Sequence, residues 1–188
     1  ISGVEVGSIS NTGTPCDGYA DYTAMSTVMT IGNDHAITVT NGNPYSSDEC
    51  GIWVDWNQDY DFDDAGETIT PVNGSPGDGP YTATITPPAG AVLGDTTMRI
   101  RITYTGDVLP CGATTYGEVE DYTVTVEEAA PFGACCDGLM CMPDMSEQDC
   151  IDLGGEYQGD GSDCDPNPCF GACCDYAALE CIEGTEDD

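Results

Sequence analysis

Short runs of β-branched and aromatic residues alternate with Gly, Pro, Asn and Asp through the first two-thirds of the chain. In MRIRITY, Met98, Ile100 and Ile102 fall on one face while Arg99 and Arg101 fall on the other. This period of two is typical of a half-buried strand. Similar runs predict strands at 4–10, 22–31, 36–40, 51–56, 81–86, 96–104 and 121–127. Turn-forming residues separate these predicted strands, and this spacing favours an all-β fold, namely a β-sandwich of Ig-like or jelly-roll type.

The hydrophobic pattern ends at the acidic segment VEEAAP, 126–131, and the chain after it is rich in cysteine. The segments FGACCDGLMCMPDMSEQDC, 132–150, and FGACCDYAALECIEGTEDD, 170–188, are copies offset by 38 residues. A unit shorter than ~40 residues with few large apolar side chains cannot be held together by burial alone. We therefore predict a sandwich at 1–128, a linker at 129–131, a disulfide-stapled repeat at 132–169 and an incomplete second repeat at 170–188.

The first repeat holds six cysteines that permit three internal bridges: Cys135, Cys136, Cys141, Cys150, Cys164 and Cys169. Fifteen pairings are possible, and the sequence does not choose among them. The second copy stops one residue before its fourth cysteine is due, so we expect the chain to be a segment of a longer repetitive protein. Arrays of such units act as spacers, stalks or fibres.

The net charge of the chain limits the classes of partner that it is expected to bind. The chain has 35 Asp and Glu against two Arg, one His and no Lys, for a net charge of −33. Nucleic acid and anionic membranes require basic patches, so neither is an expected partner. No apolar run approaches a membrane span. Twelve cysteines indicate an oxidising compartment, and we expect a secreted or cell-surface protein.

The stretch WVDWNQDYDFDDAGE, 53–67, concentrates acidic side chains directly after a predicted buried strand. Oxygen ligands at alternating positions resemble a calcium loop. Tyr60 occupies the position where such loops carry glycine, and the last acid comes one residue late. A solvated acidic turn is the alternative to Ca²⁺ binding. The candidate ligands are Asp55, Asn57, Asp59, Asp61, Asp63 and Glu67.

The run YGEVEDYTVTV, 116–126, resembles the signature of the GEVED domain, a β-sandwich module of large secreted bacterial proteins. CDGYADYT (16–23), the acidic stretch, TTMRIRITY (96–104) and PCG (110–112) match the same family in order. The GACC tail is similar to short cysteine repeats of secreted multi-module proteins. The resemblance covers about residues 1–128 and implies a non-catalytic extracellular module.

The two arginines are the only strong cations among 35 acids and share one strand face. We expect Arg99 and Arg101 to be ion-paired with the motif acids Glu118, Glu120 and Asp121, because Arg binds carboxylates in a bidentate fork. Solvated arginines and strand-edge acids, or a second cation site at the acids, are the alternatives.

Three cysteines precede the tail. Cys16 and Cys111 lie in motifs that flank the sandwich, and we predict a bridge between them. Cys50 is left over beside an odd number of tail cysteines, which suggests a bond from Cys50 to the tail or to a neighbouring chain. A free buried thiol is the alternative.

We expect no catalytic activity, because His35 is the single histidine and no nucleophile motif lies near it. Two functions remain. The first is a building block of a secreted fibre, adhesin or surface array, with copies of itself as partners, for which an exposed N-terminal edge strand could pair with the next copy. The second is a carbohydrate-binding accessory module of a secreted hydrolase, with Trp53, Trp56 and Tyr60 stacking on glycans. Asn73 is the one glycosylation sequon.

Overall fold

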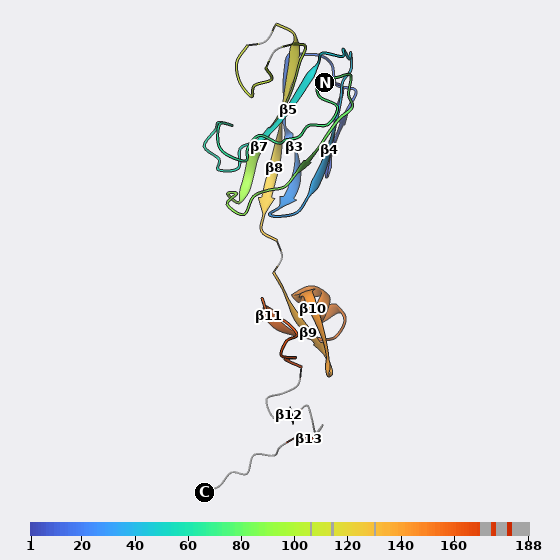
Figure 1. The fold of residues 1–188 in the computed structure, drawn as a ribbon, viewed down its shortest axis with the longest axis vertical. Helices are drawn as coiled ribbons and strands as arrows, with labels where there is room; N and C mark the ends of the chain where they lie inside the picture. The colour runs from blue at the N-terminus through green and yellow to red at the C-terminus, as the bar shows by residue number, and fades with distance from the viewer. Residues whose placement is uncertain (106, 114, 130, 170–173, 176–179, 182–188) are drawn as a thin grey trace. The chain divides into compact units, whose positions relative to one another are not determined.

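The computed structural model describes the chain except residues 106, 114, 130, 170–173, 176–179 and 182–188. It is built almost entirely of strands (Figure 1) and divides into two compact units, Ile1–Ala129 and Ala130–Asp188. The first contains β1 (Gly3–Val6), β2 (Ile9–Thr12), β3 (Tyr19–Thr30), β4 (His35–Thr40), β5 (Glu49–Val54), β6 (Tyr81–Ile85), β7 (Gly94–Thr103) and β8 (Gly117–Glu127). The second contains β9 (Phe132–Asp137), β10 (Met140–Ser146), α1 (Glu147–Asp152), β11 (Glu156–Asp160), β12 (Cys174–Asp175) and β13 (Glu180–Cys181).

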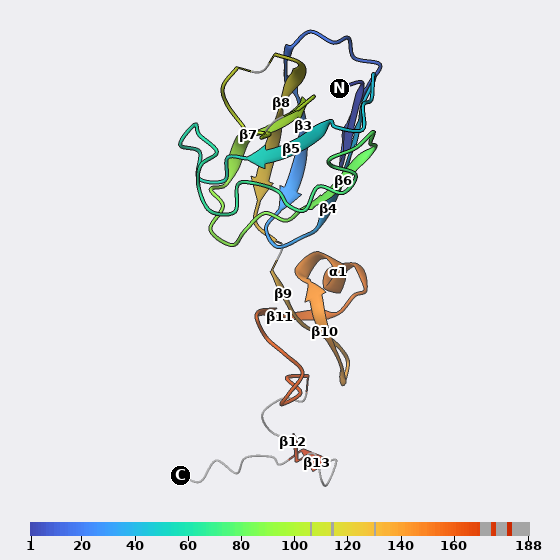
Figure 2. The same ribbon diagram turned by 45° about the horizontal axis from the view of Figure 1, so that its top comes forward.

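The first unit is a sandwich of two four-stranded sheets (Figure 2), which confirms the predicted all-β fold. One sheet has the order β2-β1-β4-β6 and is antiparallel throughout. The other has the order β3-β8-β7-β5. Here β3 and β8 run parallel, whereas β7 is antiparallel to both of its neighbours.

The core of the sandwich lies between the two sheets and follows the predicted period of two. Met98, Ile100 and Ile102 of β7 face inward and are buried. Burial of each such aliphatic side chain contributes about 1.5–3 kcal/mol to stability. The remaining inward-facing residues include Val4, Val6, Ile37, Val39, Ile52, Val54, Tyr81, Ile85, Tyr122, Val124 and Val126.

The N-terminal run predicted as one strand is a hairpin. Gly7 has a φ of 54°, and with Ser8 it turns the chain so that Val6 pairs with Ile9. A Cβ at Gly7 would lie 2.1 Å from the Thr27 hydroxyl, so only glycine fits there. The hairpin places β1 between β2 and β4. Within the N-terminal run, β1 is therefore an inner strand and β2 is the edge strand, and the other edge of this sheet is β6.

The Gly-Glu-Val-Glu-Asp motif, 117–121, lies within a strand instead of before one. It forms the first half of β8, which pairs with β3 on one side and β7 on the other. Glu118 and Glu120, two residues apart, therefore face the core, whereas Asp121 faces the outer side of the sheet.

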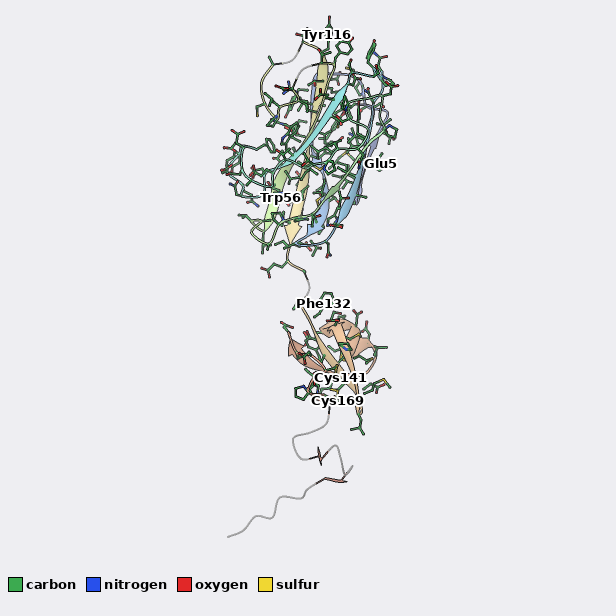
Figure 3. All side chains as sticks on the ribbon, in the orientation of Figure 1. Glu5, Trp56, Tyr116, Phe132, Cys141 and Cys169 are labelled. Carbon is green, nitrogen blue, oxygen red and sulfur yellow. A yellow bond between two sulfur atoms is a disulfide. The ribbon has the colours of Figure 1, made fainter. Side chains whose placement is uncertain are left out.

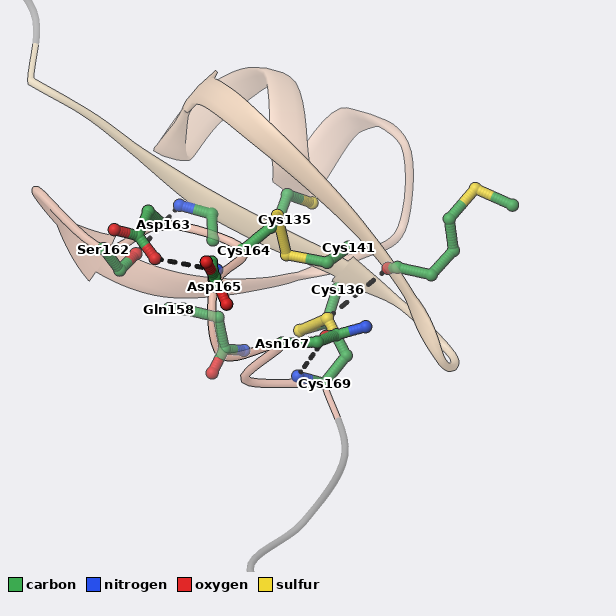
Figure 4. The surroundings of a disulfide bond; sticks show 12 residues. Cys135, Cys136, Cys141, Gln158, Ser162, Asp163, Cys164, Asp165, Asn167 and Cys169 are labelled. Carbon is green, nitrogen blue, oxygen red and sulfur yellow. Dashed lines mark hydrogen bonds between the residues drawn. A yellow bond between two sulfur atoms is a disulfide. The ribbon is translucent and has the colours of Figure 1, made fainter. Parts of the chain in front are cut away.

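Three disulfides hold the second unit together. Figure 4 shows the surroundings of one of them. Cys135 bonds to Cys150, Cys136 to Cys169 and Cys141 to Cys164. The first joins the sheet of order β10-β9-β11 to the short helix α1, and the other two join it to the segment after β11. Ser146 caps α1 by accepting the Asp149 N–H at 3.1 Å. This confirms the predicted cysteine-rich repeat and selects one pairing. In the described parts of the chain no helix is long and apolar enough to span a membrane.

Candidate functional site

Two buried carboxylates hold the acidic loop after β5 from inside. Asp55 accepts hydrogen bonds from the backbone N–H of Asp59 at 3.2 Å and of Tyr60 at 3.1 Å. Glu67 accepts one from the N–H of Trp56 at 3.0 Å, and burial raises the pKa of Glu67. Because these acids face the domain and accept backbone N–H groups, they anchor the loop.

Three exposed carboxylates gather on the outer side of this loop. One oxygen from each of Asp59, Asp61 and Asp64 lies within 4.8 Å of the others. The Asn57 amide donates to Asp59 at 3.0 Å and to Asp64 at 2.7 Å, which draws the two acids together. Carboxylate oxygens are preferred Ca²⁺ ligands, and a divalent cation relieves the repulsion among three such charges.

The cluster differs from the predicted ligand set. It includes two of the six predicted residues, Asp59 and Asp61, together with Asp64, which the alternating pattern passes over. Asp63 is exposed, and its N–H donates to Asp61 at 2.9 Å. Its carboxylate is not part of the cluster.

The backbone explains this difference. Gln58 and Tyr60 have φ values of 60° and 73°, in the left-handed region. Each such residue turns the chain, so the loop coils and positions four or five apart come close together. Tyr60 takes this conformation where calcium loops usually carry glycine.

Arg99 and Asp121 form a bidentate ion pair on the outer face of the sheet. Arg99 Nε and Nη2 donate to the two carboxylate oxygens of Asp121, each at 2.7 Å. The Arg99 guanidinium also lies 5.1 Å from the centroid of the Phe62 ring, and Tyr19 donates its hydroxyl to Asp121 at 3.1 Å. The hydrogen bond to Asp121 raises the pKa of Arg99.

Arg101 is buried beside Arg99 and binds backbone oxygens. Its guanidinium donates to the carbonyl groups of Leu109 at 2.8 Å, Cys111 at 3.2 Å and Gly112 at 2.9 Å. Arg101 therefore fixes the long loop between β7 and β8 onto the sheet. Within the described residues, no carboxylate forms an ion pair with it.

Glu118 and Glu120 lie on the core side of β8, away from both arginines. The expectation that they pair with Arg99 and Arg101 is wrong, because side chains two apart in a strand share a face and Asp121 falls on the other. Glu118 accepts the N–H of Asp17 at 3.2 Å and pairs with the amino group of Ile1.

Glu120 is the most deeply buried acid of the motif, with 0% of its surface exposed. One carboxylate oxygen accepts the hydroxyl of Tyr122 at 2.8 Å, and the other has no hydrogen-bond partner among the described residues. Burial, reinforced by the nearby Glu118 charge, raises the pKa of Glu120.

Residues 49–125 match the GEVED domain. This segment is a GEVED-domain match, and the compact unit Ile1–Ala129 that contains it is called the GEVED domain below. The match runs from β5 into β8, while the compact unit adds β1 to β4 before it. Neither a curated protein nor a solved structure matches the chain.

Glu120→Gln is expected to flatten the pH dependence of GEVED-domain stability. Because its pKa is raised in the folded state, Glu120 contributes most to stability below the ordinary glutamate pKa of about 4.3. That contribution is lost as pH rises through the raised pKa. The neutral variant lacks this loss, so it should gain on the wild type as pH increases from about 4 to about 8.

Urea unfolding across this pH range measures the effect. Glu5→Gln, which removes an exposed acid from β1, is the control and should follow the wild-type pH profile. Parallel profiles for wild type and Glu120→Gln would contradict the prediction.

The three cysteines of the GEVED domain are free thiols in the structure. Cys16 and Cys111 are exposed, and the predicted bridge between them is not formed. The loop that carries Cys111 is held by Arg101, and the Cys111 sulfur lies 3.5 Å from Arg99 Nη1. Cys50 lies in the core, where burial raises its pKa to about 12. It is not bonded to any described tail cysteine, which fits the alternative of a buried thiol.

Asn73, the predicted glycosylation residue, is exposed on the GEVED domain and bridges to Thr82 beside β6. Its N–H donates to the Thr82 carbonyl at 2.7 Å. Glycosylation at Asn73 stays a prediction.

Proposed function

We propose that this chain is a non-catalytic extracellular building block of a secreted fibre, adhesin or surface array. Its partners are copies of itself or neighbouring modules of a long chain. One observation carries the proposal: the strand pairing of the cysteine unit recurs in the second copy. Cys174 pairs with Cys181 across β12 and β13 in the way that Cys136 pairs with Cys141 across β9 and β10. Repetition of a stapled unit behind a sandwich domain suits a linear assembly.

The contacts of the motif acids support a non-catalytic role. Asp121 is bound by Arg99, Glu118 by backbone and amino groups, and Glu120 by Tyr122. The contacts of Asp121 and Glu118 tie β8 to neighbouring segments, and that of Glu120 lies within β8. The acids that distinguish this domain therefore serve its architecture.

The three aromatic side chains that the carbohydrate-binding alternative requires do not form a common exposed surface. Trp53 is 3% exposed and Trp56 is 4% exposed, so only Tyr60, at 94%, presents an open ring. The Trp53 ring folds back over Gly51, where a Cβ would lie 2.1 Å from it. These three side chains cannot stack together on a glycan.

Electron microscopy of the full chain under oxidising conditions tests the structural role. We expect filaments or linear oligomers, with cross-linked species on non-reducing gels if cysteines join neighbours. Exclusively monomeric material at all concentrations and ionic conditions would contradict the proposal.

We also propose that the acidic loop binds Ca²⁺ through Asp59, Asp61 and Asp64. A ligand that binds only the folded state at one hundred times its Kd adds about 2.7 kcal/mol. Calcium should therefore raise the melting temperature of the domain by roughly 10 °C, and a chelator should reverse this rise.

Two variants of this loop separate the cluster from general screening of charge. Asp61→Asn removes a cluster carboxylate and should abolish the calcium-dependent shift. Asp63→Asn removes the same charge from an exposed neighbour outside the cluster and should retain it. Equal shifts in both variants, or no shift in the wild type on chelation, would count against the site.

A further inference from the structure

A cavity of about 720 Å³ opens at the end of the sandwich that holds the N terminus. Its walls come from five separate segments of the chain, within residues 1–2, 14–16, 41–48, 102–104 and 116–118. Figure 3 labels Tyr116 at this end and Trp56, before the acidic loop, farther along the domain. The volume lies in the usual range of about 300–1,000 Å³ for small-molecule sites.

Three partly exposed tyrosines line this cavity. Tyr45 is 51% exposed, Tyr104 40% and Tyr116 69%. The rings of Tyr45 and Tyr104 have centroids 5.3 Å apart at 81°, and those of Tyr104 and Tyr116 are 6.2 Å apart at 87°. Rings at right angles form the corners of a box. A sugar, by contrast, stacks on a single open face, and cations are held by several rings around them.

A buried carboxylate, that of Asp48, also lines this cavity. Asp48 is 4% exposed and accepts hydrogen bonds from the Asn41 amide at 2.6 Å and from the Tyr45 N–H at 3.0 Å. Both donors are neutral. Within the described residues, the ion pairs engage Glu118 and Asp121, and none reaches Asp48. A buried carboxylate without a cation is costly, and a cationic ligand relieves that cost.

Glu118 is a second acid that lines the cavity. A field from the net charge of −33 also concentrates cations at the domain surface.

We propose that this cavity binds an organic ammonium group, with Tyr45, Tyr104 and Tyr116 as aromatic walls and Asp48 as the compensating charge. The ligand class is a quaternary or primary amine small enough to enter between the rings. The site is separate from the acidic loop and does not depend on the assembly proposed above.

Isothermal titration of the full chain with choline, and with its neutral isostere 3,3-dimethylbutan-1-ol, tests the assignment. We expect saturable choline binding at one site, at least about tenfold tighter than binding of the isostere, because only the cation gains from the ring faces and Asp48. Tyr45→Leu preserves apolar bulk while removing the π face, and it should weaken choline binding about tenfold.

Tyr60→Leu is the matched control, since it changes an exposed tyrosine of the acidic loop, and it should leave choline binding unchanged. Tyr116→Leu offers a second variant at a more exposed position if Tyr45→Leu fails to fold. Absence of choline binding, equal affinity for the isostere, or equal loss in Tyr60→Leu would overturn the proposal. Binding of cellohexaose at these tyrosines in place of choline would also overturn it, in favour of a sugar site.

Discussion

Reduction of the three disulfides is expected to unfold residues 132–169 while the GEVED domain stays folded. The buried apolar residues of this unit are Ala134 and the cysteines Cys135, Cys136 and Cys150. Such a core cannot offset the conformational entropy of about 40 residues. The disulfides span 15, 33 and 23 residues, and each contributes roughly 3–4 kcal/mol by limiting the unfolded chain.

Hydrogen exchange followed by mass spectrometry, with and without a phosphine reductant, measures this directly. Amides of β9, β10 and β11 should lose their protection on reduction, whereas those of β7 and β8 should keep it. Survival of protection in 132–169 would refute the prediction. Destabilisation of the GEVED domain by the reductant would point to the Cys16–Cys111 bridge that the sequence suggests.

Asp121→Asn is expected to destabilise the GEVED domain by about 3 kcal/mol, because it leaves the Arg99 guanidinium without its counter-charge. Asp121 is nearly buried, with 6% of its side chain exposed, so water cannot replace the lost bonds fully. Two charge-assisted hydrogen bonds from Arg99 and one from the Tyr19 hydroxyl are weakened together.

Chemical denaturation of a double-mutant cycle measures the pair. Combining Asp121→Asn with Arg99→Met should cost less than the sum of the single changes, by about 1–3 kcal/mol. Asp95→Asn is the control, since Asp95 joins the same two strands but is exposed, and among the described residues its side chain accepts the Thr125 hydroxyl alone, at 2.7 Å. It should change stability by less than about 0.5 kcal/mol. Additive losses at Arg99 and Asp121 would mean that they do not act as a pair.

Local patterns made the sandwich predictable. The alternation through 96–104 assigned Met98, Ile100 and Ile102 to the core, and the structure agrees. The same rule, applied to the motif, separates Glu118 and Glu120 from Asp121, because positions two apart share a face. This alternation is visible in the sequence, and it argues against ion pairs between the arginines and Glu118 or Glu120.

Other features depend on the path of the chain in space. Asp64 comes close to Asp59 and Asp61 because Gln58 and Tyr60 turn the backbone. A glutamine and a tyrosine do not predict a left-handed conformation at those positions. The disulfide pairing also depends on the path of the chain, because the sequence is compatible with all fifteen pairings of the six cysteines. The tyrosine cavity is harder still, because its three rings come from two loops more than 50 residues apart in the sequence.

The central place of β8 has a mechanical consequence. Tension transmitted along the chain reaches the GEVED domain through this strand, which leads directly to the cysteine unit. Because β8 is held lengthwise between β3 and β7, such a force shears two ladders of hydrogen bonds at once instead of opening one from its end. In the other sheet, β1 lies between β2 and β4. In the assembly that we propose, a force along the chain would therefore act on an inner strand of each sheet.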